Sequence, residues 1–121
     1  MENINILICD DDQGNLDILS LLLEFEGYTV SKENDSTKVM KKIKRDCPDI
    51  LILDIWMPIL CGDEIIRIIR KDSKVRDLPI IAYSASYNGA QVAIAAGADH
   101  YVSKPFNVNE IIGLIGKITA K

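Results

Sequence analysis

The sequence predicts an α/β protein with a doubly wound, five-stranded parallel sheet and helices on both faces of the sheet. Short apolar runs alternate with amphipathic stretches five times along the 121 residues, which is the pattern of repeated strand–helix units. The apolar runs are nearly continuous, as expected for strands that are covered on both sides. The length suits one domain, so we expect residues 1–121 to form a single domain.

The first half of the chain supplies three strands and two helices. Leucines at positions 16, 19, 22 and 23 have helical spacing and predict a helix over residues 16–25, which Gly27 ends. A second helix is expected over residues 36–45, with either Asp35 or Ser36 as its N-terminal cap. The strands of this half are expected at residues 4–9, 28–31 and 50–53.

The second half continues the alternation with clear end signals. Pro79 introduces a strand, Gly97 ends an alanine-rich helix, and Asn107 and Glu110 have the spacing of a capping box for a final helix through Thr119. We therefore expect helices at residues 63–70 and 88–96, and strands at residues 80–83 and 101–102.

Bulk composition excludes several classes of protein. The net charge of −4 and pI near 4.9 give no basic footprint for nucleic acid. The N-terminus lacks the basic and apolar regions of a secretory signal, and no apolar run is long enough to span a membrane. Three cysteines without a CxxC pair favour reduced thiols. We expect a cytoplasmic protein that binds neither nucleic acid nor a membrane directly.

Polar residues follow four of the predicted strands at the point where each strand ends. The carboxyl ends of parallel strands meet at one edge of the sheet, where ligands bind in open α/β folds. The sequence therefore predicts one rim that gathers Asp10, Asp11, Asp12, Asp54, Ser84 and Lys104.

Several carboxylates at one rim repel each other unless a cation lies among them. Mg²⁺ prefers carboxylates, water and a substrate phosphate as ligands, and Lys104 offers a point charge for a phosphate oxygen. The Asp54 carboxylate can act as a nucleophile and form an aspartyl phosphate. Taken singly, each residue has an ordinary alternative: a strand-end aspartate is often a turn or cap residue, and Ser84 or Lys104 can be surface residues.

Four segments resemble the response-regulator receiver domain, and the resemblance spans the whole chain. They are residues 6–12, 51–58, 82–85 and 97–106, and their order and separation are more specific than any one of them. The resemblance implies a flavodoxin-like, (βα)5 fold similar to that of chemotaxis regulators. It implies two-component or phosphorelay signalling through phosphorylation of the domain.

The resemblance also implies roles for particular residues. Asp54 matches the phosphoacceptor, supplied by a histidine kinase, a histidine phosphotransfer protein or a small phosphodonor. The implied ligands of Mg²⁺ or Mn²⁺ are Asp10, Asp11, Asp54 and the backbone carbonyl of Trp56. The implied phosphoryl-contacting and switch residues are Ser84, Ala85, Lys104 and Tyr101, and a cis peptide is implied between Lys104 and Pro105.

The implied mechanism is a two-state switch. Ser84 moves toward the phosphoryl group and Tyr101 turns inward, which alters the surface of the fourth helix, fifth strand and fifth helix. Such a domain signals rather than turning over a separate substrate, although it catalyses its own phosphorylation and dephosphorylation. It acts on a downstream protein that the sequence does not identify, as a monomer or a weak phosphorylation-dependent dimer.

Three alternatives remain at this point. The chain could be a receiver-like interaction module that takes no phosphate, or a receiver fragment of a hybrid kinase, although Met1 and a complete final helix favour a single-domain protein. An aspartate-nucleophile phosphatase would carry a second aspartate two residues after Asp54, where Trp56 stands.

Trp56 could screen the phosphoryl group from water, or lie over the loop or against a partner. Cys61 stands where the family commonly has aspartate.

Overall fold

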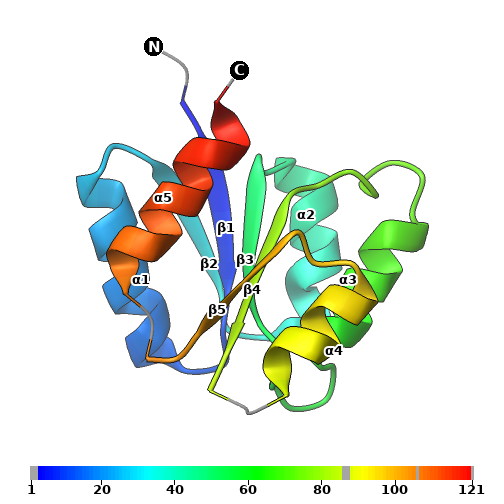
Figure 1. The fold of residues 1–121 in the computed structure, drawn as a ribbon. Coiled ribbons are helices and arrows are strands. Elements are labelled where there is room, and N and C mark those ends of the chain that lie inside the picture. The colour runs from blue at the N-terminus through cyan, green and yellow to red at the C-terminus, as the bar shows by residue number, and fades with distance from the viewer. Residues whose placement is uncertain (1–2, 86–87, 106, 121) are drawn as a thin grey trace.

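Five parallel strands form one sheet in the computed structural model, which describes residues 3–85, 88–105 and 107–120. The strand order is β2-β1-β3-β4-β5, and the strands run downward in Figure 1, away from the two chain ends. The predicted doubly wound α/β fold is confirmed. The strands are β1 (Asn5–Cys9), β2 (Thr29–Glu33), β3 (Ile50–Asp54), β4 (Ile80–Ser84) and β5 (His100–Ser103).

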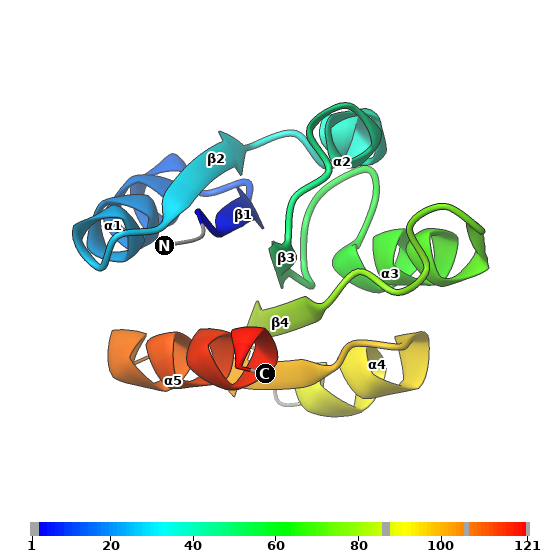
Figure 2. The same cartoon turned by 90° about the horizontal axis from the view of Figure 1, so that it is seen from above.

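The helices cover both faces of the sheet. They are α1 (Gln13–Phe25), α2 (Val39–Asp46, after a short 3₁₀ turn at Ser36–Lys38), α3 (Gly62–Lys71), α4 (Gly89–Ala96) and α5 (Val108–Thr119). Helices α1 and α5 lie on one face, and α2, α3 and α4 lie on the other (Figure 2). We call these two sides the α1/α5 layer and the α2–α4 layer.

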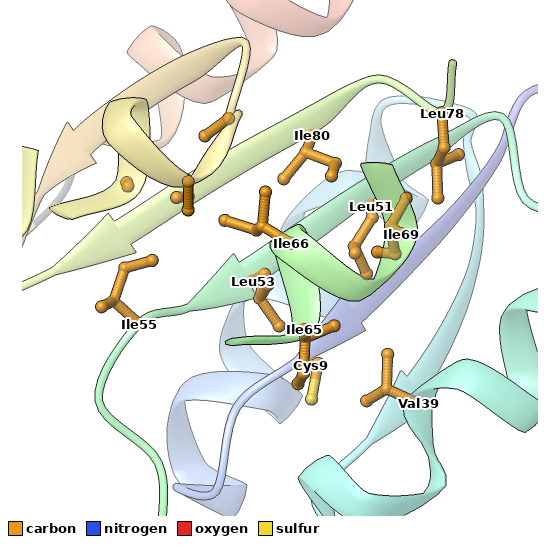
Figure 3. Packing of buried hydrophobic residues seen from close by; sticks show 14 of the residues in the cluster. Cys9, Val39, Leu51, Leu53, Ile55, Ile65, Ile66, Ile69, Leu78 and Ile80 are labelled. Carbon is orange, nitrogen blue, oxygen red and sulfur yellow. The ribbon is translucent and has the colours of Figure 1, made fainter. Parts of the chain in front are cut away.

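Alternate residues of each strand enter opposite layers, so the sheet supports two apolar clusters. Along β4, Ile80 and Ala82 belong to the α2–α4 layer, whereas Ile81 and Tyr83 belong to the α1/α5 layer. Figure 3 shows residues of β3 and α3 that pack together in the α2–α4 layer. Each fully buried aliphatic side chain contributes about 1.5–3 kcal/mol, so the apolar strands hold the rim in place.

Element ends differ from the predicted ones where side chains cap helices or an edge strand is polar. Helix α1 begins earlier than predicted because the Asp12 side chain accepts a hydrogen bond from the Asn15 N–H. Asp35, not Ser36, caps the turn before α2, through the Thr37 N–H. Edge strand β2 begins after Tyr28 and runs to Glu33. Asn107 caps α5 by accepting from the Asn109 N–H.

Two further expectations can be compared with the structure. The peptide bond between Lys104 and Pro105 is cis. Within the described ranges, no helix has the length and apolar character that crossing a membrane requires.

Candidate functional site

The site lies where the chain reverses its direction of winding, between β1 and β3. The register pairs Cys9 with Leu53 across these two strands, so Asp10 follows β1 beside Asp54 at the end of β3. Crevices at such reversal points are where ligands bind in open α/β sheets. The fold itself therefore brings together two carboxylates that are 44 residues apart in the sequence.

Asp10, Asp11 and Asp54 form one acidic cluster. Each offers a carboxylate oxygen, and the three oxygens lie within 4.8 Å of one another. Asp10 and Asp54 are buried, whereas Asp11 is exposed. Hard oxygen donors at this spacing, open to solvent on one side, fit Mg²⁺ or Mn²⁺, which bind through a few carboxylates and otherwise keep water.

Lys104 reaches into this cluster from the residue after β5. Its Nζ lies 3.2 Å from Asp54 Oδ2 and 3.4 Å from Asp10 Oδ2. Its backbone N–H donates to the Ser84 carbonyl oxygen at 2.8 Å. This hydrogen bond holds the Lys104 backbone beside the end of β4. One ammonium group is thus shared by two buried carboxylates.

The two buried carboxylates have opposite pKa shifts. Burial and repulsion from Asp10 raise the pKa of Asp54 to about 6, despite the opposing effect of Lys104. For Asp10, burial acts to raise the pKa, but hydrogen bonds from Tyr83 and from the Asp12 N–H, together with the Lys104 charge, outweigh it and lower the pKa. Burial acts to lower the pKa of Lys104, but its two carboxylate partners raise it overall.

Tyr83 belongs to the site, although sequence reasoning did not select it. It is fully buried, and its hydroxyl donates to Asp10 Oδ2 at 2.6 Å. The Lys104 Nζ lies 4.7 Å from the centre of its ring. The available signal was an aromatic residue with a hydroxyl inside an otherwise aliphatic buried strand, because a buried phenol usually has a hydrogen-bond partner.

The predicted switch residues lie on the other side of β4. Ser84 is buried, and the half-buried Tyr101 donates its hydroxyl to the Ser84 carbonyl oxygen at 3.0 Å. A Cβ on Gly89 would lie 2.5 Å from the Tyr101 hydroxyl oxygen and 2.9 Å from Ser84 Oγ. Glycine at the start of α4 therefore permits this close approach. Ala85 follows β4 and is exposed.

The loop after β3 flanks the carboxylates with an aromatic side chain. The Trp56 N–H donates to Asp54 Oδ1 at 3.2 Å, and the residue is 43% exposed. The N–H of Gly62 donates to the Ile55 carbonyl oxygen at 2.7 Å and closes this loop. Asp12 lies outside the three-carboxylate cluster and caps α1, so for this residue the ordinary interpretation holds.

Comparison with known proteins agrees with this geometry. Residues 6–116 match the family model of the response regulator receiver domain. Response regulator MprA of Mycobacterium leprae is 38% identical over an alignment of 114 residues that covers 93% of this chain. The chain spans about half the length of the curated MprA relatives, 49% in this case.

Two solved structures illustrate the likeness. The Francisella response regulator 1452 receiver domain is 26% identical with a TM-score of 0.87, and the match covers 96% of each chain. The receiver domain of sensor histidine kinase PA1611 from Pseudomonas aeruginosa is 26% identical with a TM-score of 0.90, and covers 99% of this chain and 100% of its own. That structure has a magnesium ion coordinated in its active site cleft.

The sequence match, the strand order and the rim of carboxylates and lysine agree with one another. This chain therefore belongs to the response regulator receiver domain family.

Proposed function

We propose that Asp54 accepts a phosphoryl group in a reaction that depends on Mg²⁺ or Mn²⁺. The observation that carries the proposal is the pairing of a buried Asp54 with Lys104, 3.2 Å away, inside a cluster of three carboxylates. An Asp54 oxygen attacks phosphorus and forms a P–O bond, while the bond from phosphorus to the donor breaks and the donor keeps its electron pair.

The chain's own groups fit the parts of this reaction. The pKa of Asp54 near 6 leaves its carboxylate mostly ionised at neutral pH, as a nucleophile must be. Lys104 carries a positive charge that can move from the carboxylates to a phosphoryl oxygen. Asp10, Asp11, Asp54 and the Trp56 carbonyl would hold the cation. When bound, the cation offsets the carboxylate charges and polarises the phosphoryl oxygens.

We infer that the phosphoryl donor is a phosphohistidine on a histidine kinase or a histidine phosphotransfer protein, or a small phosphodonor. Membership of the receiver family supports this donor class. Helix α1, which borders the acidic rim, also exposes an apolar strip. Its members Ile18, Leu21 and Phe25 are 61%, 68% and 89% exposed. A helix that carries a phosphohistidine could pack against such a strip.

The output proposed here is a change in the surface formed by α4, β5 and α5. A phosphoryl group adds a charge of about −1.5 to −2 and three acceptor oxygens. It would draw Lys104, the Ser84 hydroxyl and the Ala85 backbone toward it. The hydrogen bond from the Tyr101 hydroxyl to the Ser84 carbonyl supports a coupling between the movement of Ser84 and the position of Tyr101 in β5.

We also propose that residues 1–121 form one receiver domain that catalyses its own dephosphorylation and acts on a downstream protein. The two continuous apolar clusters that span the sheet support a single folding unit. The match to the receiver domain of a sensor histidine kinase is equally compatible with a receiver that is part of a longer chain. We propose a monomer or a weak dimer that phosphorylation strengthens.

A mass measurement tests the proposal. The chain is incubated with Mg²⁺ and acetyl phosphate, and the intact mass is compared with those of Asp54→Asn and of Asp77→Asn, an exposed control. A phosphate-mass adduct in the parent and control but not in Asp54→Asn is expected. Beryllofluoride binding, followed by the fluorescence of the single tryptophan, covers the case of fast hydrolysis. No adduct and no beryllofluoride response in the parent, or an equal adduct in Asp54→Asn, would refute the proposal.

A further inference from the structure

Tyr83 links the acidic cluster to the core of the α1/α5 layer. It belongs to the buried cluster that also contains Leu16 of α1 and Ile111 of α5, and its register partner in β3 is Asp54. The pleat of β4 sends its side chain to the side of the sheet on which Asp10 lies. The hydroxyl, 2.6 Å from Asp10 Oδ2, is therefore held by a rigid support.

Among the described residues, the other hydrogen bonds to Asp10 are longer than the one from Tyr83. Lys104 Nζ and Asn15 Nδ2 both lie 3.4 Å from Asp10 Oδ2, and Lys104 is shared with Asp54. The Asp12 N–H, at 2.9 Å, binds the other oxygen. Oδ2 thus depends on Tyr83 for its short hydrogen bond. Burial and the Asp10 charge raise the pKa of the Tyr83 phenol, so the phenol keeps its proton and donates it.

Tyr83 also contacts Lys104, through its ring. The ammonium nitrogen lies 4.7 Å from the ring centre, within the range of a cation–π interaction. An aromatic face attracts a cation from many directions, whereas a hydrogen bond needs one direction. The lysine can therefore shift along the face of the ring without losing this contact.

We propose that Tyr83 is a positioning residue that keeps Asp10 oriented toward the divalent cation when Lys104 moves from the carboxylates to the phosphoryl group. This inference rests on the proposed function. Without the phenol, the donors to Asp10 Oδ2 that remain among the described residues would be Lys104 and Asn15. Asp10 would then hold Lys104 more tightly and would lose its fixed orientation. Groups that orient the ligands of a metal typically change its affinity by about 10–100-fold when they are removed.

The test is a Mg²⁺ titration that needs no phosphoryl transfer. Binding to the parent, Tyr83→Phe and Tyr28→Phe is followed by Trp56 fluorescence. Tyr28→Phe makes the same substitution at a half-buried tyrosine that packs against the same layer. We expect Tyr83→Phe to weaken Mg²⁺ binding by about tenfold, and Tyr28→Phe to bind like the parent. Phosphorylation of Tyr83→Phe by acetyl phosphate at saturating Mg²⁺ should also be slower, because Asp10 retains Lys104.

A double-mutant cycle separates positioning from general stability. If Tyr83 acts through Asp10, Tyr83→Phe should weaken Mg²⁺ binding less in an Asp10→Asn background than in the parent. Equal Mg²⁺ affinity in Tyr83→Phe and the parent, even with a lower urea midpoint in EDTA, would show a purely structural role and overturn the inference. So would equal weakening in both backgrounds. A parent that takes no phosphate and no beryllofluoride would instead refute the proposed function, so the two failures are distinguishable.

Discussion

The raised pKa of Asp54 predicts a contribution to folding stability that is lost as the pH rises from about 4 to 7. Folding raises this pKa from its ordinary value of 3.8 to about 6, so the folded chain binds the proton more tightly than the unfolded chain. The stabilisation is fully present below pH 4 and is lost as the pH rises through 6. A shift of about two units, at 1.36 kcal/mol each, amounts to about 3 kcal/mol.

The variant Asp54→Asn isolates this effect. Other groups also titrate in this range, but both proteins contain them. The lowered pKa of Asp10 acts in the opposite direction, mainly at and below about pH 4. The unfolding free energy of the parent minus that of Asp54→Asn should fall by about 3 kcal/mol between pH 4 and 7. Asp77→Asn, in the exposed turn before β4, should follow the parent throughout.

Urea unfolding followed by far-UV circular dichroism, in EDTA, provides the measurement. Added Mg²⁺ should stabilise the parent more at pH 7 than at pH 5, because the ionised Asp54 is the form that binds the cation. A difference between parent and Asp54→Asn that stays constant, or that rises with pH, would refute the reasoning. Such a result would mean that the effect of Lys104, which lowers the pKa of Asp54, outweighs the effects of burial and of Asp10, which raise it.

Three other changes test the surroundings of the site. Gly89→Ala places a Cβ 2.5 Å from the Tyr101 hydroxyl oxygen, so the urea midpoint should fall by the equivalent of about 1–3 kcal/mol; an unchanged midpoint would contradict the close packing. Arg70→Ala removes side-chain hydrogen bonds to the carbonyl oxygens of residues 76, 78 and 97 and should cost about 2 kcal/mol. Alanine at Arg67, which forms a surface ion pair with Asp63, should lower the free energy of unfolding by only about 0.5 kcal/mol. Equal losses of stability in the two variants would argue against a special role for Arg70. If the Trp56 indole screens the phosphoryl group from water, Trp56→Asn should speed loss of the phosphate adduct several-fold, and an equal or slower loss would overturn this hypothesis.

The fold was predictable because most of its strands are buried on both faces and therefore apolar. The edge strands β2 and β5 are the exceptions, and β2 is the more polar of the two. Lys32 and Glu33 are polar residues of β2, and an edge strand needs no apolar partner on its open side. Its length therefore could not be read from hydrophobicity. The start of α1 was missed for a different reason, since Asp12 was grouped with the aspartates of the site although its side chain caps the helix.

The strand-end rule also predicted the gathering of Asp10, Asp54 and Lys104, because parallel strands must end at a common edge. It could not predict Tyr83. The contact between Tyr83 and Asp10 joins residues 73 positions apart, and it depends on which side of the sheet the pleat sends the phenol. In the sequence, the phenol of Tyr83 indicates a buried hydrogen-bond partner, but nothing there identifies Asp10 as that partner.

Under the proposed function, two adjacent residues of β4 connect the phosphorylated site with both faces of the sheet. Tyr83 turns toward the carboxylates, and the next residue, Ser84, provides the carbonyl that binds Tyr101 of the opposite layer. The recipient protein would be changed by altering the exposed residues of α4, β5 and α5, and the phosphoryl donor by altering those of α1. Because α4 lies on the opposite face of the sheet from α1, substitutions on α4 could change the recipient without touching the donor surface, as long as Tyr83 and Ser84 are kept.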